Sequence, residues 1–315
     1  MERFIKWKHT IYSKEYDDLL KKEIETWGVA WTSTMTYDEV KKSVPYRTYR
    51  NGIIDEEIHC IASLEKKNIR VLELWWSNGW LSEEIAKVDN VSEITCIDIS
   101  LSESRKEQTI HNKKYILVKG DLNKIEEIQF DIDWYDVIIT HGTLHHLVDP
   151  KRVLEFSVNT LLKKEWILMI NDSYILSSLQ LKTNALIVLI FIKVPKFIVE
   201  LKFIDFLTSI IKIPMVLFHK NSAASIAHNH AASPFESISS YEDYASVYTM
   251  RNIKLLTFRR FAAIPAIFWA IDHYPFKNTQ IIQKLIKQLW RLDAYLIQKN
   301  IFSWDAHLTI FQKHE

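Results

Sequence analysis

The sequence predicts an α/β fold in which helices cover both faces of a mostly parallel sheet. Short apolar strands alternate with helical segments between residues 53 and 171, at spacings that suit βαβ crossovers. These strands are apolar on both faces, as the strands of a buried parallel sheet are. The chain has 315 residues, which is enough for one large domain with insertions or for two domains.

Helices and strands follow in order along the chain. Apolar residues at helical spacing predict a helix over 53–66. The segment before the fourth strand contains both acidic and apolar residues and is predicted to be a helix or a loop. Seven strands are predicted, at 70–74, 92–99, 115–118, 134–140, 166–171, 254–260 and 308–312. Further helices are predicted at 81–87, 101–112, 151–162, 241–250, 262–272 and 278–299, of which 101–112 has the weakest pattern.

Composition and charge exclude several classes of protein. The formal net charge is +1, so bulk charge does not indicate a nucleic-acid partner. The two cysteines lie in core-like segments, and the N-terminus has no apolar core of the kind that a signal peptide needs, so we expect a cytoplasmic protein. The chain has five glycines, where average usage gives roughly 22. No Cys/His spacing indicates a zinc site, and we expect no metal.

The loops after the first four strands carry the residues with chemical potential. In a parallel sheet of this kind, ligands bind at the carboxyl ends of the strands, so all four loops face one rim. The first loop contains Gly79 and the second strand ends at Asp98, where an acidic residue is placed to accept hydrogen bonds from ribose hydroxyls. Gly120-Asp121 follows the third strand, and residues 141–147 follow the fourth.

These motifs together resemble class I S-adenosylmethionine-dependent methyltransferases. Val71-Leu72-Glu73-Leu74 followed by Asn78-Gly79-Trp80-Leu81 is similar to the first motif, and Cys96-Ile97-Asp98-Ile99-Ser100 to the second. Gly120-Asp121-Leu122 resembles the adenine-side motif, and Tyr135-Asp136-Val137-Ile138 with Gly142-Thr143-Leu144-His145-His146-Leu147 resembles the fourth. The resemblance covers about residues 55–172. It implies a seven-stranded, mostly parallel Rossmann-like sheet with an α-helical insertion.

The resemblance also implies roles for single residues. Asp98 would hold the ribose and Asp121 would face the adenine of the cofactor. Glu73 would support the loop after the first strand, which contains Gly79 and would bind the cofactor. His145 and His146 would be the catalytic residues that contact the acceptor. The set implied to bind S-adenosylmethionine is Glu73, Trp75, Ser77, Gly79, Asp98, Ile99, Asp121, Leu122 and His141. Catalysis would be mainly in-line positioning, because the methyl group is already activated.

Two glycine-dependent turns of the family are altered here. Trp75 and Ser77 stand where the family has glycine, at a sharp turn that passes close to the cofactor. Glu165-Trp166 stands where the family has a Gly-Gly turn before the fifth strand. A non-glycine residue with positive φ costs on the order of 1–2 kcal/mol. The bulky Trp75 ring therefore raises a second hypothesis, a non-catalytic binding or scaffold protein of the same fold whose cofactor site Trp75 fills.

Simpler interpretations remain open for several of these residues. Asp98 has an alternative role as the cap of a helix beginning at residue 101, and Asp121 is balanced between capping and ligand binding. A solvated or capping role is favoured for at least one of His145 and His146. His228 and His230 lie in a polar loop, which explains them better than a metal site does.

The remaining chain divides into an extension and an insertion. We expect an N-terminal helical extension at 1–50, the methyltransferase-like domain at 51–175 and 241–315, and a helical cap at 176–240 that forms the pocket for a small-molecule acceptor or a glycan or lipid precursor. The basic, apolar stretch 181–220 leaves open a peripheral contact with a lipid surface. The sequence does not indicate an oligomeric state.

Overall fold

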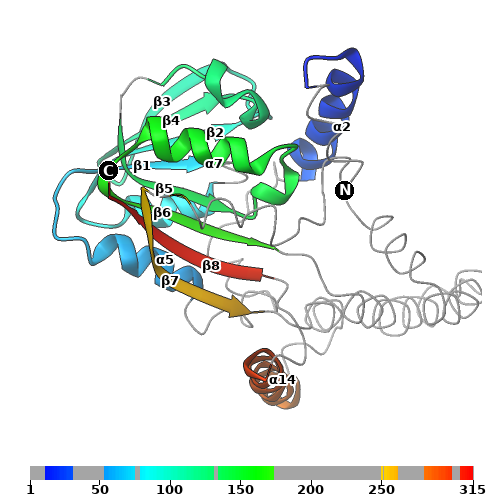
Figure 1. Ribbon diagram of the computed structural model, residues 1–315, viewed down its shortest axis with the longest axis vertical. Helices are drawn as coiled ribbons and strands as arrows, with labels where there is room; N and C mark the ends of the chain where they lie inside the picture. The colour runs from blue at the N-terminus through cyan, green and yellow to red at the C-terminus, as the bar shows by residue number, and fades with distance from the viewer. Residues whose placement is uncertain are drawn as a thin grey trace, which may run out of the picture.

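The fold is built on one sheet. The computed structural model describes residues 11–30, 53–74, 79–130, 134–173, 250, 252–261, 280–299 and 306–314. Within these ranges eight strands pair in the order β3-β4-β2-β1-β5-β6-β8-β7, with helices on both sides (Figure 1). The strands are β1 Ile69–Leu74, β2 Val91–Asp98, β3 Arg105–Ile110, β4 Lys113–Lys119, β5 Tyr135–His141, β6 Leu162–Ser173, β7 Ile253–Phe261 and β8 Ala306–Lys313.

The helices confirm most of the sequence prediction. Those predicted at 53–66, 81–87, 151–162 and 278–299 are present, with the third ending in a π-helical turn. The helical elements are α2 Lys14–Ala30, α5 Ile53–Ala62, α6 Trp80–Ala86, α7 Pro150–Phe156, α14 Gln280–Gln298, the 3-10 helices η1 Leu122–Glu127 and η2 Leu144–His146, and the π-helix η3 Ser157–Leu161.

The direction of the strands places four loops on one edge. β1 pairs in parallel with both β2 and β5, and β2 pairs in parallel with β4. The carboxyl ends of these four strands therefore meet at the same rim, and the strand order reverses between β1 and β5, where ligands bind in open α/β sheets. The last strand, β8, which was predicted at 308–312, runs antiparallel between β6 and β7.

Two apolar cores flank the sheet, because successive side chains of a buried strand point to opposite faces. On one face Leu72 and Leu74 pack with α7, η1 and η3. On the other face Val71 packs with α5 and α6 through residues such as Ile61 and Ile85. Both faces of the parallel strands are buried, so the expectation of a sheet covered on both sides is confirmed.

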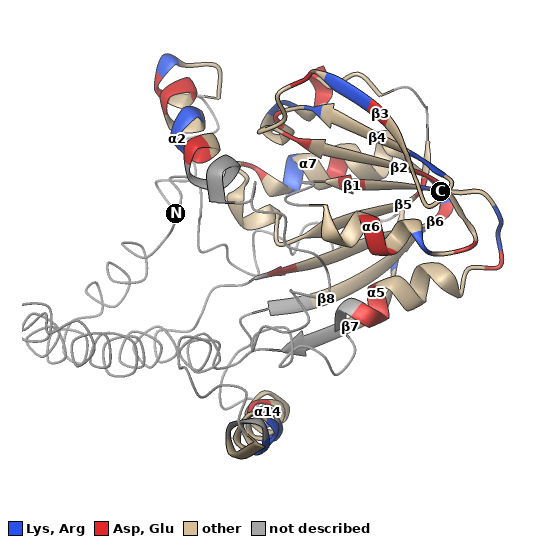
Figure 2. Cartoon of the chain, turned by 180° about the vertical axis from the view of Figure 1, so that it is seen from behind, with Lys and Arg blue, Asp and Glu red and all other residues tan. Residues whose placement is uncertain are grey.

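The predicted helix at 101–112 is wrong, and the sheet has eight strands instead of seven. Residues 105–110 form β3, an edge strand antiparallel to β4, through a turn in which His111 and Asn112 have φ values of 49° and 61°. Two positive φ values match a type I′ hairpin, usually signalled by Asn-Gly. The sequence hides this strand because an exposed edge needs no apolar alternation, and charged residues protect it from aggregation (Figure 2).

The first part of β6, where the family has its Gly-Gly turn, adopts a left-handed backbone conformation without glycine. Glu165 has φ 67°, in the left-handed region that favours glycine. Its carbonyl accepts a hydrogen bond of 3.0 Å from the side-chain amide of Gln312 on β8. The altered turn is therefore tolerated as a local strain and does not change the path of the chain.

Several expectations fall outside the described residues and remain predictions. These are most of the N-terminal extension, the insertion 176–240 with its basic stretch 181–220, the helix 262–272 and, apart from residue 250, the helix 241–250. Trp75 and Ser77 also lie outside the described ranges, as do His228 and His230. None of the helices that the structure describes is long and apolar enough to cross a bilayer.

Candidate active site

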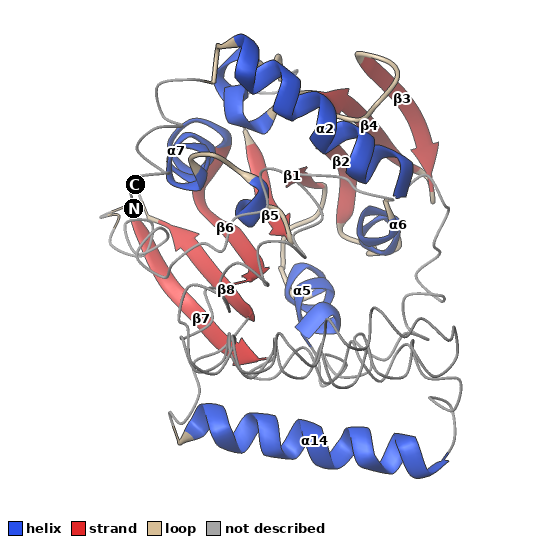
Figure 3. Cartoon of the chain, turned by 90° about the vertical axis from the view of Figure 1, so that its right-hand side faces the viewer, coloured by secondary structure: helices blue, strands red, loops and turns tan. Residues whose placement is uncertain are grey.

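A pocket opens at the carboxyl ends of β2 and β4. Five of the residues predicted to bind cofactor or acceptor line it: Asp98, Ile99, Asp121, Leu122 and His146. The remaining lining residues are Leu20, Glu23, Ile97, Gly120, Asn123 and Leu147. The pocket thus joins the two strand-end motifs with the histidine loop after β5 and with helix α2, which lies at this end of the sheet (Figure 3).

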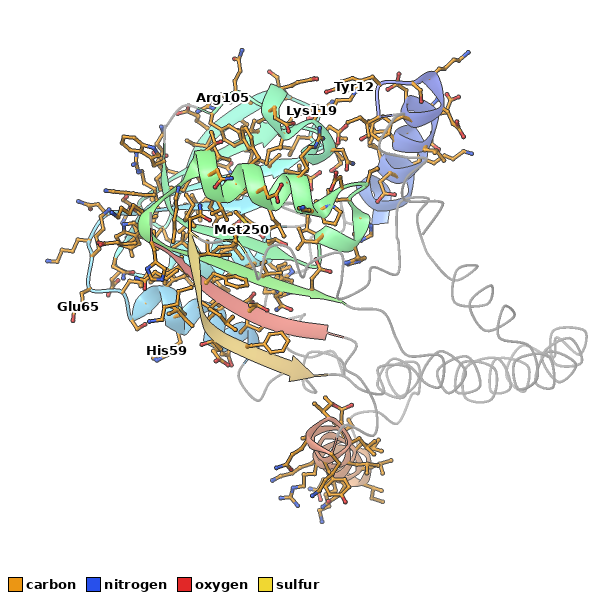
Figure 4. All side chains as sticks on the ribbon, in the orientation of Figure 1. Tyr12, His59, Glu65, Arg105, Lys119 and Met250 are labelled. Atoms are coloured by element: carbon orange, nitrogen blue, oxygen red, sulfur yellow. The ribbon has the colours of Figure 1, made fainter. Side chains whose placement is uncertain are left out.

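Helix α2 brings three of its residues to this rim. Ser13 caps the helix, its hydroxyl accepting a hydrogen bond of 3.2 Å from the backbone N–H of Tyr16. Tyr16, Leu20 and Glu23 are spaced four and three residues apart, so they lie on one helical face. Tyr16 is fully buried against Ile11 and the loop after η2. This face is the buried side of α2, whereas Tyr12, just before the helix (Figure 4), is exposed and contacts the domain only at its surface, with its ring 5.1 Å from Nζ of Lys124.

Asp121 fastens α2 to the strand-end loop. The Tyr16 hydroxyl donates a hydrogen bond of 2.6 Å to Oδ2, and the Asn123 N–H donates one of 2.9 Å to Oδ1. Burial raises the pKa of Asp121, and the hydrogen bond from Tyr16 opposes that rise. The carboxylate is therefore both the cap of η1 and a contact between distant segments, which favours a structural role beside any ligand role.

Asp98 closes the turn that follows β2. Its Oδ1 accepts hydrogen bonds from the backbone N–H of Ser100 at 2.7 Å and from the Ser100 hydroxyl at 2.6 Å. The side chain is buried yet lines the pocket. No helix begins after it within the described residues 99–112, so the alternative role as a helix cap is wrong, and Asp98 caps a turn instead.

Glu23 is the unusual group in the pocket. It is 2% exposed, and its Oε1 lies 3.1 Å from Nδ1 of His146. The pair is not aligned for a hydrogen bond, and neither carboxylate oxygen has a hydrogen-bond partner among the described residues. A buried polar group without such a partner costs stability. Glu23 therefore provides acceptor capacity that a ligand with hydroxyl or amino donors can satisfy.

Gly120 permits close packing beneath the pocket. A Cβ atom at this position would lie 2.6 Å from Cδ1 of Ile128 and 3.2 Å from Cγ2 of Ile97. Any larger residue would have to displace these side chains. The glycine therefore lets the Asp121 loop fold tightly against the end of β2, where its N–H donates to the carbonyl of Asp98 at 3.2 Å.

A second cluster lies on the loop after β5. Oδ1 of Asp172, at the end of β6, is 2.6 Å from Nδ1 of His145. Its Oδ2 accepts hydrogen bonds from the backbone N–H groups of Thr143, at 3.1 Å, and Leu144. The His145 and His146 rings lie 4.1 Å apart between centroids. One buried carboxylate thus orients His145 and shapes the turn that carries both histidines.

Thr143 joins the ends of two strands at the point where the strand order reverses. Its hydroxyl donates a hydrogen bond of 2.9 Å to the carbonyl of Leu74, the last residue of β1. Before it, Gly142 has φ 63°, and a Cβ at this glycine would meet no atom within 4 Å. The loop after β5 is therefore fixed to the carboxyl end of β1.

Glu73 lies in β1 and does not line the pocket. Its Oε2 accepts a hydrogen bond from the Ser82 hydroxyl of α6, and Ser82 is 3.0 Å from the thiol of Cys96. Burial raises the pKa of Glu73 to about 8, although the hydrogen bond from Ser82 opposes the rise. Glu73 thus connects β1 to α6 through Ser82, and its support of the loop between them stays a prediction.

His141 ends β5 and faces helix α5. Its Nδ1 lies 3.2 Å from Oε2 of Glu57 and 3.2 Å from Nδ2 of Asn171. Trp80 packs edge-on at 5.5 Å between ring centroids. Burial lowers the pKa of His141, but the negative charge of Glu57 and its contact outweigh burial, and the pKa is raised overall. Next to Trp80, Gly79 opens α6 with φ 77°.

The structure separates the predicted residues into two groups. Asp98, Ile99, Asp121, Leu122 and His146 line the pocket, whereas Glu73, Gly79, His141 and His145 lie elsewhere, around the carboxyl ends of β1 and β5. Sequence analysis missed Glu23, Tyr16, Glu57 and Asp172. Asp172 follows the fifth parallel strand, so the strand-end rule that selected Asp98 identifies it too. Glu23 is marked only by a charge on the apolar face of α2.

Comparison with known proteins identifies the family of the segment that holds this site. Residues 65–188 match the family model described as a methyltransferase domain. This segment is a methyltransferase domain. It contains β1 to β6 of the Rossmann-like sheet, both histidines, Asp172 and every pocket-lining residue except Leu20 and Glu23, which belong to α2. The resemblance in the sequence motifs is confirmed for this segment. No curated protein sequence matches the chain.

Solved structures with similar folds are distant in sequence. The cyclopropane synthase MmaA2 from Mycobacterium tuberculosis is 12% identical, with 82% of each chain covered and a TM-score of 0.47. The YcgJ protein from Bacillus subtilis is 12% identical, with 83% of this chain and 99% of that chain covered and a TM-score of 0.44. The plantazolicin methyltransferase BpumL, solved in complex with SAH, is 13% identical, with 95% of this chain and 99% of that chain covered and a TM-score of 0.41. The methyltransferase assignment itself depends on the family model and the strand order.

Proposed function

We propose that the protein transfers the methyl group of S-adenosylmethionine to a small molecule or to a glycan or lipid precursor. The observation that carries this proposal is the pocket at the ends of β2 and β4. It combines the strand-end carboxylate Asp98 with the buried carboxylate Glu23, which contacts His146 but accepts no hydrogen bond from the described residues, between apolar walls. The methyltransferase domain supplies the reaction class, and the chemistry of the pocket supports the cofactor.

The lining residues fit the adenosine half of such a cofactor. Ile99 and Leu122 offer apolar surfaces on which a purine ring can pack, and Asp98 is placed to accept from ribose hydroxyls. Glu23, without a hydrogen-bond partner, provides further acceptors for a hydroxyl or amino group. When bound, the cofactor supplies a methyl group on a sulfonium, which is already activated for in-line transfer.

The chain contributes proton transfer through His145. Nδ1 of His145 donates to Oδ1 of Asp172 in the neutral tautomer that this contact favours. Its Nε2 then carries the lone pair, and it can accept a proton from a hydroxyl or amine of the acceptor. A positioned imidazole of this kind contributes about 10²- to 10⁴-fold to the rate when the nucleophile must lose a proton.

Binding of the cofactor is the direct test. We expect isothermal titration calorimetry to detect S-adenosylmethionine binding at micromolar to millimolar strength, and Asp98→Asn to weaken it about tenfold to a hundredfold, because hydrogen bonds to a charged acceptor are lost. Asp89→Asn, an exposed acid in the turn before β2, is the matched control and should bind normally. No detectable binding to the unmodified protein would overturn the proposal.

One observation favours a second candidate, a non-catalytic protein of the same fold. Asp121 and Asp98 both accept hydrogen bonds from within the chain, and the bond from Tyr16 to Asp121 holds α2 at the rim without any ligand. On this hypothesis Trp75 fills the cofactor site, and Trp75→Gly combined with Ser77→Gly should create or strengthen S-adenosylmethionine binding. Tight binding by the unmodified chain would contradict it.

A further inference from the structure

Helix α14 exposes an apolar stripe on its outer face. Ile281, Leu285, Leu292 and Tyr295 are 79%, 45%, 45% and 50% exposed. They are spaced four, seven and three residues apart, which places them on one side of a helix. Exposed Gln288 lies on the same side between Leu285 and Leu292, so the stripe consists of two apolar pairs. Large apolar side chains gathered on one exposed helical face in this way mark an interaction surface.

The same helix has a separate buried side. Ile286, Asp293 and Ile297 are buried, at spacings of seven and four residues. α14 therefore already has a face that packs on its own protein, and the exposed stripe is not the face by which it is attached. The helix runs along the edge of the molecule, beyond β7 and β8 (Figure 3), and it is seen end-on in Figure 4 with side chains projecting around it.

Basic residues flank the stripe. Lys284, Arg291 and Lys299 are exposed, and their positions fall beside or in line with the apolar residues. Asp293 is the only acidic residue of α14, and it belongs to the buried side. The exposed face thus combines apolar side chains with positive charge alone, although the whole chain has a net charge of only +1. This pairing is complementary to a leaflet whose surface is anionic and whose interior is apolar.

We propose that this α14 surface, defined by Ile281, Lys284, Leu285, Arg291, Leu292, Tyr295 and Lys299, binds anionic lipid membranes. The helix lies parallel to the leaflet, with the apolar stripe at the headgroup boundary and the basic groups at the phosphates. Tyr295 suits that boundary, because its ring is apolar and its hydroxyl remains at the polar level. The surface is independent of the methyltransferase proposal and of the stretch 181–220.

Vesicle flotation of the full-length protein tests this proposal. We expect the protein to float with phosphatidylcholine vesicles that contain phosphatidylserine, and to float much less with phosphatidylcholine alone. The triple variant Lys284→Gln, Arg291→Gln and Lys299→Gln should lose about a hundredfold in partitioning, because each basic group near an anionic surface contributes about fivefold. The double variant Ile281→Gln and Leu292→Gln should also lose binding.

A matched control removes the same charge elsewhere. The control is the triple variant Lys106→Gln, Lys163→Gln and Lys164→Gln. These lysines are exposed, the first on β3 and the other two on the first part of β6. This control should float like the unmodified protein, and circular dichroism should show that all variants are folded. Normal flotation of the α14 variants, or equal loss in the control, would overturn the proposal.

Two further outcomes would also overturn it. The proposal is wrong if the unmodified protein does not float with anionic vesicles. It is also wrong if vesicle binding is absent and sedimentation velocity instead shows concentration-dependent self-association, which the double variant Ile281→Gln and Leu292→Gln abolishes. In that case the stripe is an interface between copies of the chain.

Discussion

Asp172 holds the imidazole of His145 from the end of the neighbouring strand, with Oδ1 2.6 Å from Nδ1. The other oxygen of the same carboxylate accepts two backbone N–H groups from the turn that carries the histidine. The orientation of the side chain and the shape of its loop therefore depend on one buried group. This arrangement separates the effects that substitutions at the two residues should have.

Replacing His145 should affect turnover and not cofactor binding. We expect His145→Gln to lower kcat about 10²- to 10⁴-fold, because the proton acceptor is lost, while the Kd for S-adenosylmethionine stays unchanged. Transfer of a labelled methyl group from the cofactor into a small-molecule extract measures the activity. His59→Gln, on the exposed side of α5, is the control. Equal turnover of His145→Gln and the control would remove His145 from the reaction.

Replacing Asp172 should affect stability as well. Asp172→Asn removes the charge and one acceptor oxygen, so at least one N–H of the turn or of His145 loses its partner. We expect the free energy of unfolding in urea to fall by about 2–3 kcal/mol. Nitrogen NMR of the imidazole should show a loss of the preference for the proton on Nδ1. A variant that is as stable as the unmodified protein would show that the turn does not depend on this carboxylate.

The contact between Tyr16 and Asp121 should control how firmly α2 is attached. Tyr16→Phe keeps the buried ring and removes only the hydroxyl, so the half-buried carboxylate of Asp121 loses one donor. We expect the unfolding free energy to fall by about 1–3 kcal/mol. Amide exchange in residues 14–25 should become faster than in the unmodified protein, and this increase should be larger than any in the sheet. Tyr295→Phe, where the tyrosine is half exposed, should change neither. Unchanged exchange in α2 would mean that apolar packing alone holds the helix.

The buried carboxyl of Glu73 should make stability fall as pH rises. Its pKa is raised from 4.5 to about 8, so the folded state binds the proton more tightly than the unfolded state does. This contribution is complete below pH 4.5, decreases between pH 4.5 and about 8, and is absent above. Glu73→Gln cannot ionise, so its unfolding free energy should vary less over that interval and exceed that of the unmodified protein near pH 8. Parallel curves for the two proteins would contradict this.

The positive φ of Glu165 should be a removable strain. Glu165→Gly fits the left-handed conformation without a Cβ, so we expect a gain of up to about 1 kcal/mol in unfolding free energy, reduced by the greater freedom of glycine in the unfolded chain. Glu165→Val should instead lose stability, because a β-branched residue is least tolerated there. Thermal unfolding of both variants measures the difference. A loss on changing to glycine would mean that the Glu165 side chain itself stabilises the turn.

The sheet could be predicted because its strands are buried on both faces. Short segments that carry apolar residues on both faces, such as 70–74 and 134–140, are typical of a covered parallel sheet. The edge strand β3 could not be predicted in this way. Its residues 105–110 are polar, and the hairpin turn uses His111 and Asn112 without glycine. Strand pairing there depends on β4, which no local pattern in 105–110 reveals.

The candidate site was predictable where it depends on strand ends. Asp98 and Asp121 were found by their positions, and both line the pocket. Glu23 and Tyr16 were not found, because they reach the rim from a helix about 100 residues earlier in the chain, and only tertiary packing brings that helix there. The partners of His141 and His145 were missed for the same reason, since Glu57 and Asp172 belong to other elements.

The hydrogen bond from Thr143 to the carbonyl of Leu74 has a consequence for protein engineering. It anchors the last residue of β1, and Gly79, with φ 77°, already provides a glycine at the start of α6. The four residues 75–78 are thus a short cassette between two fixed attachment points. Libraries that replace residues 75–78 with four-residue segments of different glycine content can be selected for ligand binding. Ligand preference can thus be varied while the sheet is left intact.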